Sequence, residues 1–483
     1  MSHEVIERLR RALPAGAVLS SQEDLKPYEC DGLTMYRQTP LAVVLPTDEA
    51  EVAAVLRLCH EQKVPVIARG AGTGLSGGAT PRPDAVVLSL ARLNRILSVD
   101  PLARTARVQP GVRNLAISEA AAPHRLYYAP DPSSQIACTI GGNVAENSGG
   151  VHCLKYGLTV HNVLALRVIN IEGEVLEVGS AAADAPGYDL LALLTGSEGL
   201  LGVVTEVTVR LIPRPDCARV VLAVFDDLAK AGRAVADVIA AGIIPAGLEM
   251  MDRPTIAAVE PFVRAGYPLD AEAILLCESD GTPAEVAEEI ERVEAVMREA
   301  GSTECRVSRD EAERLRFWAG RKAAFPAMGA LSPDYYCMDG SIPRKRLAAV
   351  LQAIRRMEAK YGLRCTNVFH AGDGNLHPLI LFDSNIADEV ERAEQFGGEI
   401  LELCVREGGS ITGEHGVGME KIKQMCVQFG SGELETFHAI KRAWDALELL
   451  NPGKAVPTLH RCAEFGRLHV HGGRVPHPEL PRF

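Results

Sequence analysis

Short apolar runs separated by polar and turn residues dominate the first 216 residues, which predicts strands and hairpins with a few short helices. The predicted strands are 41–46, 64–67, 85–88, 97–99, 105–109, 163–169, 174–178 and 203–211. Helical spacing of apolar residues predicts helices over 5–13, 50–61 and 116–122, with Thr47 capping the second. The strands and hairpins outnumber the helices, so an α+β domain is expected rather than a doubly wound one.

From residue 217 the pattern changes to strands that alternate with long amphipathic helices. Strands are predicted at 220–224 and 273–277, and helices at 227–241, 283–300, 309–325, 388–406 and 433–450. The stretch Thr282-Pro283-Ala284-Glu285 is a capping box with proline at the first helical position. We therefore expect a ferredoxin-like α+β cap, and divide the chain into a first domain (1–216), a cap with C-terminal helices (217–455) and a tail (456–483).

Composition narrows the class of protein. A formal net charge of −13 argues against binding nucleic acid or an anionic membrane surface. The longest apolar run, 238–248, is too short to cross a bilayer, and the first residues do not form a signal peptide. The expected location is cytoplasmic, with any membrane association made through a partner.

A glycine-rich stretch, 64–80, is the strongest local signal in the chain. A β-branched run leads into Gly70, Gly72, Gly74, Gly77 and Gly78, which let backbone N–H groups approach an anion closely. Residues 72–77 match G-x-G-x-x-G, but a second apolar run follows at once and leaves no room for the helix of a nicotinamide site. A non-Rossmann pyrophosphate loop for a flavin is the preferred interpretation, and a glycine-rich turn without ligand is the alternative.

A second stretch, 128–150, alternates glycines with small hydroxyl and amide residues. Such residues cannot build a core, but they suit close approach to a planar ring and its polyol chain. The alternative is a long irregular surface loop, which is uncommon in compact domains unless it is functional.

Two histidines bracket a predicted turn in the second half. His370 ends one predicted strand and His377 begins the next, so their Cβ atoms would lie roughly 5 Å apart. Glu414, in a later glycine-rich loop, adds a carboxylate. Two histidines and one glutamate are typical of a catalytic zinc site with an open position, whereas two ordinary strand-end histidines are the alternative.

Two further residues are candidates for catalysis. His415 follows Glu414 directly and would be a general base if it reaches the same pocket. Arg321 lies among apolar residues on a predicted helix and could bind a carboxylate through its forked guanidinium. The alternatives are a core histidine and a solvated helix arginine.

None of the twelve cysteines forms a C-x-x-C pair, so the usual iron–sulfur motifs are missing from the sequence. A reduced flavin in this chain would have to pass its electrons to another subunit or to a quinone. We therefore expect a partner.

Six segments together resemble the flavin subunits of bacterial glycolate oxidases, in the vanillyl-alcohol oxidase / p-cresol methylhydroxylase superfamily. These segments are 69–78, 130–150, 196–199, 370–377, 413–418 and 458–483. The resemblance covers essentially the whole chain and implies an FAD-binding domain of the p-cresol methylhydroxylase type followed by a substrate cap.

The resemblance also implies an activity and its site. It implies oxidation of glycolate or a D-2-hydroxy acid to the 2-oxo acid, with a divalent metal such as zinc on His370, His377 and Glu414. His415 would be the base and Arg321 would bind the substrate carboxylate. The residues implied to contact FAD are Arg69, Gly70, Ala71, Gly72, Thr73, Gly74, Ser76, Gly77, Pro130, Asp131, Ser134, Thr139, Gly141, Gly142, Asn143, Asn147, Gly149, Gly150, Glu198 and Val204.

Substrate and partners follow from the same resemblance. Relatives that use dicarboxylates tend to carry a lysine near 335–339, and this chain has none there, which favours a small monoacid. The implied partners are an iron–sulfur subunit and a second flavin-domain subunit, with the tail as a candidate docking segment. The alternatives are D-lactate oxidation, ether-lipid synthesis on the same fold, and a noncatalytic flavin- or metal-binding subunit.

Overall fold

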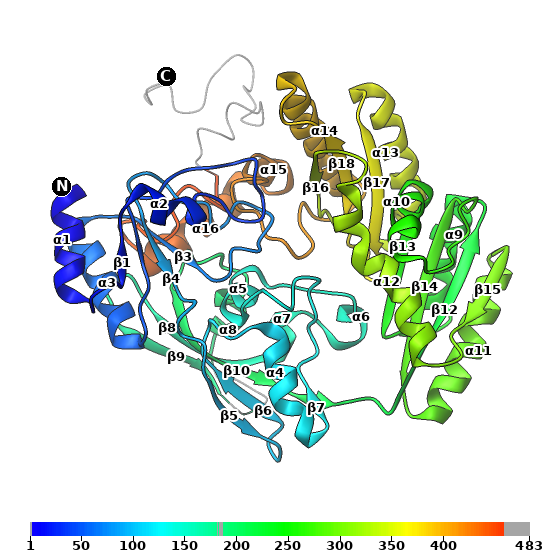
Figure 1. Ribbon diagram of the computed structural model, residues 1–483, viewed down its shortest axis with the longest axis horizontal. Coiled ribbons are helices and arrows are strands. Elements are labelled where there is room, and N and C mark those ends of the chain that lie inside the picture. The colour runs from blue at the N-terminus through cyan, green and yellow to red at the C-terminus, as the bar shows by residue number, and fades with distance from the viewer. Residues whose placement is uncertain (1, 181, 183–186, 458–483) are drawn as a thin grey trace.

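The computed structural model describes residues 2–180, 182 and 187–457, which form two lobes side by side (Figure 1). The N-terminal lobe contains three sheets. The first has the order β1 (Val18–Leu19), β2 (Ala42–Val44), β4 (Val86–Ser89) and β3 (Val66–Arg69). The second has the order β5 (Ile96–Asp100), β6 (Thr105–Val108), β10 (Val203–Arg210), β8 (Val163–Ile169) and β9 (Val175–Gly179). The third pairs β11 (Ile212–Pro213) with β7 (Leu126–Tyr127).

Short helices pack around these sheets, as the sequence predicted. They are α1 (Ser2–Ala12), α2 (Gln22–Leu25), α3 (Glu49–Gln62), α4 (Asn114–Ala121), α5 (Ile140–Glu146), α6 (Cys153–Tyr156), α7 (Thr159–Asn162) and α8 (Leu190–Leu194). The N-cap residue of α3 lies one position later than predicted. Asp48, not Thr47, accepts the Glu51 N–H, and Thr47 instead donates its own N–H and hydroxyl to the Glu51 carboxylate.

The glycine stretch joins two parallel strands. β3 and β4 pair in parallel although only residues 70–85 separate them, and no helix lies in that connection. The prediction that no crossover helix fits there is confirmed. The crossover between these two parallel strands is an irregular loop instead of a helix.

The second lobe, the cap, is built on a seven-stranded antiparallel sheet. Its strands follow the order β15 (Glu304–Val307), β12 (Cys217–Phe225), β14 (Ala273–Gly281), β13 (Gly247–Asp252), β17 (Arg364–His370), β18 (Pro378–Phe382) and β16 (Asp334–Cys337). The central strands are buried on both faces because helices cover both. In β12, Val221 and Ala223 belong to one core and Val220 and Leu222 to the other, as the two-residue period of a strand requires.

Four helices cover one face of the seven-stranded sheet, and two helices cover the opposite face. The first group is α9 (Leu228–Ala240), α11 (Pro283–Glu299), α13 (Leu347–Tyr361) and α14 (Ala387–Arg406). The second group is α10 (Arg253–Val263) and α12 (Glu311–Met328). The capping box of α11 forms as predicted, and that helix buries Val286, Ile290, Val293 and Met297. The predicted fold class, α+β with a cap beside the first domain, is confirmed.

The C-terminal segment returns to the N-terminal lobe with α15 (Ile422–Gln428) and α16 (Ser431–Trp444), and α16 packs against that lobe through Ile440 and Trp444 (Figure 1). The helix predicted to reach residue 450 ends at Trp444. Asp445 ends it, because its carboxylate accepts the Lys441 ammonium and the Leu450 N–H. Leu450 then forms a parallel bridge with Val66. This return places the chain beside the glycine stretch.

No helix in the described part of the chain is long and apolar enough to cross a membrane. The predicted docking tail lies almost entirely beyond residue 457, outside the described residues.

Candidate functional site: a cavity shared by both lobes

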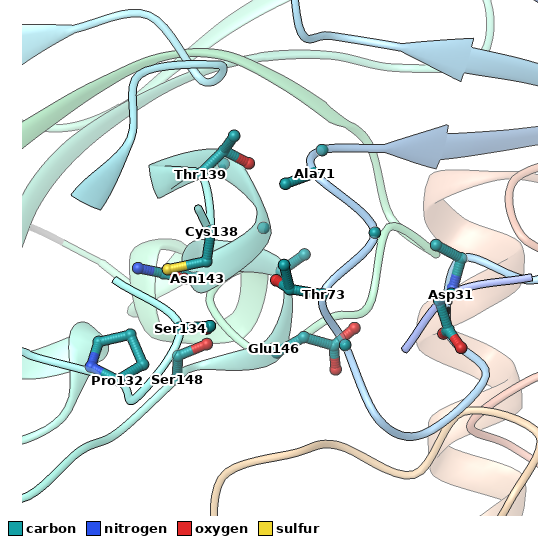
Figure 2. A pocket seen from close by; sticks show the side chains of 18 of the residues that line it. Asp31, Ala71, Thr73, Pro132, Ser134, Cys138, Thr139, Asn143, Glu146 and Ser148 are labelled. Atoms are coloured by element: carbon teal, nitrogen blue, oxygen red, sulfur yellow. Dashed lines mark hydrogen bonds between the residues drawn. The ribbon is translucent and has the colours of Figure 1, made fainter. Parts of the chain in front are cut away.

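A cavity of about 520 Å³ lies where the two lobes meet, within the size range of small-molecule sites. One wall comes from the N-terminal lobe, from the glycine stretch, the segment 132–148 and the loop after α8. The other comes from α12 and from His377, Glu414 and His415. Figure 2 shows the first wall, with Thr73, Thr139 and Glu146 arranged around the open space.

Backbone geometry explains the glycines of the first wall. Gly72 has a φ of +71°, in the left-handed region that favours glycine. A Cβ on Gly70 would lie 2.3 Å from the Thr139 hydroxyl, and a Cβ on Gly141 would lie 2.6 Å from Pro110 Cβ. The backbone at Gly70 and Gly141 therefore lies too close to neighbouring residues to carry a side chain.

Three side chains of the cap converge at the other end of the cavity. Glu414 Oε1 lies 3.1 Å from His370 Nε2 and 3.2 Å from His377 Nε2. The two imidazole rings lie 5.0 Å apart between centroids and are nearly perpendicular. The predicted pairing of β17 and β18 is confirmed. The two histidines are near each other but not directly opposite, because His370 bridges Asn375 and the His377 carbonyl accepts the Val368 N–H.

These three residues fit a divalent metal ion. Their ligand atoms all lie within 4.8 Å of one another. Both ring nitrogens of His377 are buried and make no hydrogen bond of good geometry among the described residues. Burial lowers the pKa of His377 to about 4, so this imidazole is neutral, the form that binds a metal. An orphaned neutral imidazole beside a carboxylate is a donor set that a cation would satisfy.

His415 lies directly beside this set. Its ring stacks on His377 with centroids 5.0 Å apart and an angle of 6°. Burial lowers the pKa of His415, so the imidazole is neutral and can accept a proton. Its Nδ1 lies 3.8 Å from Asp339 Oδ2. The irregular loop that the glycines were expected to permit does bring His415 and Glu414 to one cavity.

Asp339 holds the loop that carries both residues. It is fully buried and accepts the backbone N–H groups of Gly413, Glu414 and His415 at 3.1, 2.8 and 2.7 Å. Lys421 donates to its other oxygen. Three consecutive N–H groups on one carboxylate fix the direction of the loop backbone, and thereby the positions of the two side chains.

Arg321 lies behind this wall rather than in it. It is 2% exposed, and its Nε donates to Glu249 Oε2 at 2.6 Å. The other oxygen of Glu249 lies 2.7 Å from His370 Nδ1, so one carboxylate orients both residues. Nη2 of Arg321 is buried without a hydrogen bond among the described residues and remains available as a donor. Arg321 does not line the cavity, whereas its neighbour Lys322 does.

The cavity wall contains many of the predicted FAD contacts but not all of them. The predicted residues that line it are Arg69, Gly70, Ala71, Gly72, Thr73, Gly74, Ser134, Thr139, Gly141, Gly142, Asn143, Glu198 and Val204. Those that do not are Ser76, Gly77, Pro130, Asp131, Asn147, Gly149 and Gly150.

Several of the outlying residues have structural contacts instead. Asp131 accepts the backbone N–H of His152 and lies 2.7 Å from its Nδ1. The Ser76 carbonyl accepts the Met419 N–H. Gly149 makes room for Glu414, since a Cβ there would lie 2.6 Å from Glu414 Oε2. These glycine-rich segments therefore connect the two lobes as well as shaping the cavity.

Sequence reasoning missed Asp31, Glu146, Glu249, Lys322 and Asp339. Glu146 stands between two predicted contacts, Asn143 and Asn147, and a single acidic residue in a stretch of small polar ones was the available signal. Glu249 and Asp339 had no local signal, because their partners lie 72 or more positions away.

Two family models match the chain. One, described as FAD binding domain, covers residues 40–179, and the other, FAD linked oxidases, C-terminal domain, covers residues 214–455. The chain belongs to the FAD-linked oxidases, and the predictions of FAD as cofactor and of an FAD-dependent oxidoreductase are confirmed.

Curated relatives agree with this family. The chain is 64% identical over 479 residues to the glycolate oxidase subunit GlcD of Escherichia coli (strain K12), which covers 99% of this chain and 96% of that protein. It is 40% identical to the subunit of the same name from Bacillus subtilis (strain 168), over 88% of this chain and 91% of that one. It is 34% identical to a D-lactate dehydrogenase of Anaerostipes hadrus, over 93% and 97%. The resemblance inferred from the motifs is confirmed.

Solved structures agree on the fold. p-Cresol methylhydroxylase with substrate bound superposes with a TM-score of 0.81 at 19% identity, covering 95% of this chain and 97% of that one. An alkyldihydroxyacetonephosphate synthase superposes with a TM-score of 0.73 at 17% identity, covering 94% and 85%. At these identities the similarity concerns architecture alone.

Proposed function

We propose that this protein oxidises glycolate, or a closely related small 2-hydroxy acid, to the 2-oxo acid. The observation that carries the proposal is the shared cavity. The glycine-lined wall and the cluster of His377, Glu414 and His415 face one space, so a bound flavin and a bound alcohol would meet there. The names of the relatives supply the substrate class, glycolate in two of them and D-lactate in another.

In this proposal residues 1–216 form the FAD-binding domain and residues 217–455 the substrate domain. FAD, when bound, supplies the hydride acceptor. His370, His377 and Glu414 would hold a divalent metal such as zinc, which supplies Lewis acidity toward the substrate hydroxyl. The buried nitrogens of His377, which make no hydrogen bond of good geometry among the described residues, support this assignment.

The residues of the chain then have distinct roles. Neutral His415 accepts the proton of the substrate hydroxyl, since its imidazole is buried, uncharged and part of the cavity wall. Asp339 fixes the loop that presents this imidazole. Lys322 lines the cavity and is the cation proposed for the substrate carboxylate, whereas Arg321, predicted for that role from the sequence, lies behind the wall and orients Glu249.

Reoxidation requires a second protein. We infer an iron–sulfur subunit, with a second flavin-domain subunit in the same complex, or a quinone-linked acceptor. The name of the Escherichia coli relative, an oxidase subunit, supports a complex. The tail 456–483 remains the candidate docking segment, and membrane association, where it occurs, would be made through a partner.

The test is anaerobic addition of glycolate to the purified yellow protein, followed by flavin absorbance, with D-lactate in a parallel experiment. Faster bleaching by glycolate supports the proposal, and faster bleaching by D-lactate reassigns the substrate. A protein that stays yellow with every small hydroxy acid would instead be a noncatalytic flavin-binding subunit.

A further inference from the structure

Two glutamates, Glu198 buried and Glu146 partly exposed, lie where the glycine-lined wall meets the catalytic loop, the loop that carries Glu414 and His415. Glu146 is the last residue of α5, and Glu198 follows α8 in a tight turn with a φ of +52°. Both line the cavity. Figure 2 shows Glu146 reaching from α5 toward the glycine stretch, close to Thr73.

The two carboxyl groups have different hydrogen-bond partners. Glu198 Oε1 and Oε2 accept the backbone N–H groups of Val417 and Gly418, each at 2.7 Å. Two such donors favour an ionised carboxylate. Glu146 Oε2 is buried and has no hydrogen-bond partner among the described residues. An ionised carboxylate in that position would leave a buried oxygen without a hydrogen-bond donor, with only the more distant charges of Lys421 and Lys454 to oppose its desolvation.

The two groups are also close neighbours. A Cβ on Gly416 would lie 2.1 Å from Glu146 Oε2 and 3.0 Å from Glu198 Oε1, so these oxygens are no more than about 5 Å apart. Two carboxyl groups this close and this buried do not both ionise readily, and the one without donors keeps its proton.

No cation in the described residues is paired with Glu146. Lys421 donates to Asp339 and to the Gly416 carbonyl. Lys454 donates to the carbonyls of Gly78 and Thr80. The remaining charged neighbour, Asp31, is itself acidic.

We propose that Glu146 is a neutral carboxylic acid whose O–H donates a hydrogen bond to the isoalloxazine of bound FAD. Burial raises the pKa of Glu146 well above its ordinary value, and Glu198 and Asp31 raise it further. Burial also raises the pKa of Glu198, but there the amides of Val417 and Gly418 oppose it.

Glu146 borders both the glycine stretch, where a Cβ on Gly78 would lie 2.8 Å from its Oε1, and the loop that carries His415, and the second contact is the one that points to the ring. Its Oε2 touches Gly416, the residue next to His415, at the end of the cavity where substrate is oxidised. The phosphates instead suit the backbone N–H groups of the glycine stretch. A hydrogen bond from a neutral donor to a ring nitrogen or carbonyl favours electron-rich flavin without placing a negative charge beside it.

Infrared difference spectroscopy on the holoenzyme tests this proposal. FAD is reduced photochemically, so the result depends on neither glycolate nor a metal, and the failure of this inference is distinguishable from failure of the proposed function. The oxidised-minus-reduced spectrum of the wild type should contain the carbonyl band of a protonated carboxylic acid, and the band should shift in D₂O. It should be missing in Glu146→Gln. A wild-type spectrum without the band, or a Glu146→Gln spectrum that retains it, would overturn the proposal.

FAD affinity provides a second measurement. Glu146→Gln keeps a neutral donor and should stay within about twofold of the wild-type Kd. Glu146→Leu loses one hydrogen bond, so its Kd should rise about five- to tenfold. An unchanged Kd in Glu146→Leu would contradict a contact with the flavin.

Glu198→Gln is the control, since it changes the same chemical group in the neighbouring glutamate. It should lower the thermal stability of the holoenzyme because it weakens two charge-assisted hydrogen bonds to the cap, whereas Glu146→Gln should not. Equal destabilisation by the two variants would show that Glu146 is also ionised, and would overturn the proposal.

Discussion

The two ends of the cavity are built in different ways. The nucleotide end is made mainly of backbone, from glycine segments that pass so close to each other that side chains are excluded. The catalytic end is made of ionisable side chains from segments far apart in the chain, held by buried carboxylates such as Asp339 and Glu249. The first end therefore depends on shape, and the second on a network of charges and protons.

This difference predicts which substitutions separate cofactor binding from chemistry. Changes at the catalytic end should leave FAD bound and abolish or slow its reduction. Changes at the nucleotide end should release FAD, whatever they do to the chemistry.

The largest effect is expected for His415→Ala. Loss of the base should slow flavin reduction by glycolate by about 10²- to 10⁴-fold, while the protein stays yellow. Anaerobic stopped-flow absorbance measures both properties. His60→Ala, on α3 in the N-terminal lobe, is the control and should reduce at the wild-type rate. Normal single-turnover reduction in His415→Ala would refute the assignment.

Glu249→Gln should weaken the metal site without loss of FAD. The carboxylate of Glu249 lies 2.7 Å from His370 Nδ1 and orients that ligand, and partners of this kind typically contribute 10- to 100-fold in metal affinity. Metal content after dialysis against a graded chelator measures the effect. Glu291→Gln, exposed on α11, is the control. If Glu249→Gln retained as much metal as the wild type, the result would argue against the proposed metal site.

Gly141→Ala tests the nucleotide end. Its new Cβ would meet Pro110 Cβ at 2.6 Å, and an overpacked site costs about 1–3 kcal/mol. We expect FAD affinity to fall about tenfold or more. Gly432→Ala on α16 has open space around it and should bind FAD normally, with a stability gain of about 1 kcal/mol. Tight FAD binding in Gly141→Ala would show that this close approach is dispensable.

The smallest effect is expected in the pH dependence of folding stability. It comes from a buried glutamate behind the loop that carries Glu414 and His415. Burial raises the pKa of Glu420 from 4.5 to about 8. Between pH 4.5 and 8 the Glu420 carboxyl is protonated in the folded protein and ionised in the unfolded chain. This residue therefore lowers the free energy of unfolding as the pH rises toward 8. Glu420→Gln should therefore match the wild type below pH 4.5 and gain stability up to pH 8. Parallel stability curves for the two proteins over that range would contradict the shift.

The contrast between the two ends also explains how far the sequence could be interpreted. The glycine stretch and the His370–His377 turn are local, so their spacing alone predicted a phosphate loop and a histidine pair. The capping box at Thr282 was equally local and is confirmed. Glu414 and His415 were joined to that pair because of their residue types and their glycine-rich loop, and the resemblance implied the same roles.

Features that depend on tertiary contacts were not predictable. Glu249 and Asp339 gain their roles from residues distant in sequence, and Glu146 is distinguished from Glu198 only by which backbone amides reach it. The end of α16 at Trp444 also involves a tertiary contact, since Lys441 donates to the Leu200 carbonyl as well as to Asp445. Amphipathic periodicity continues past that point and gave no sign of it.

The most direct test is a crystal structure of the FAD-loaded protein. The account predicts density for the pyrophosphate against the backbone of Gly70 to Gly74, and for the flavin ring beside His415 and Glu414. A nucleotide bound elsewhere, or a flavin ring at the end remote from these side chains, would contradict it.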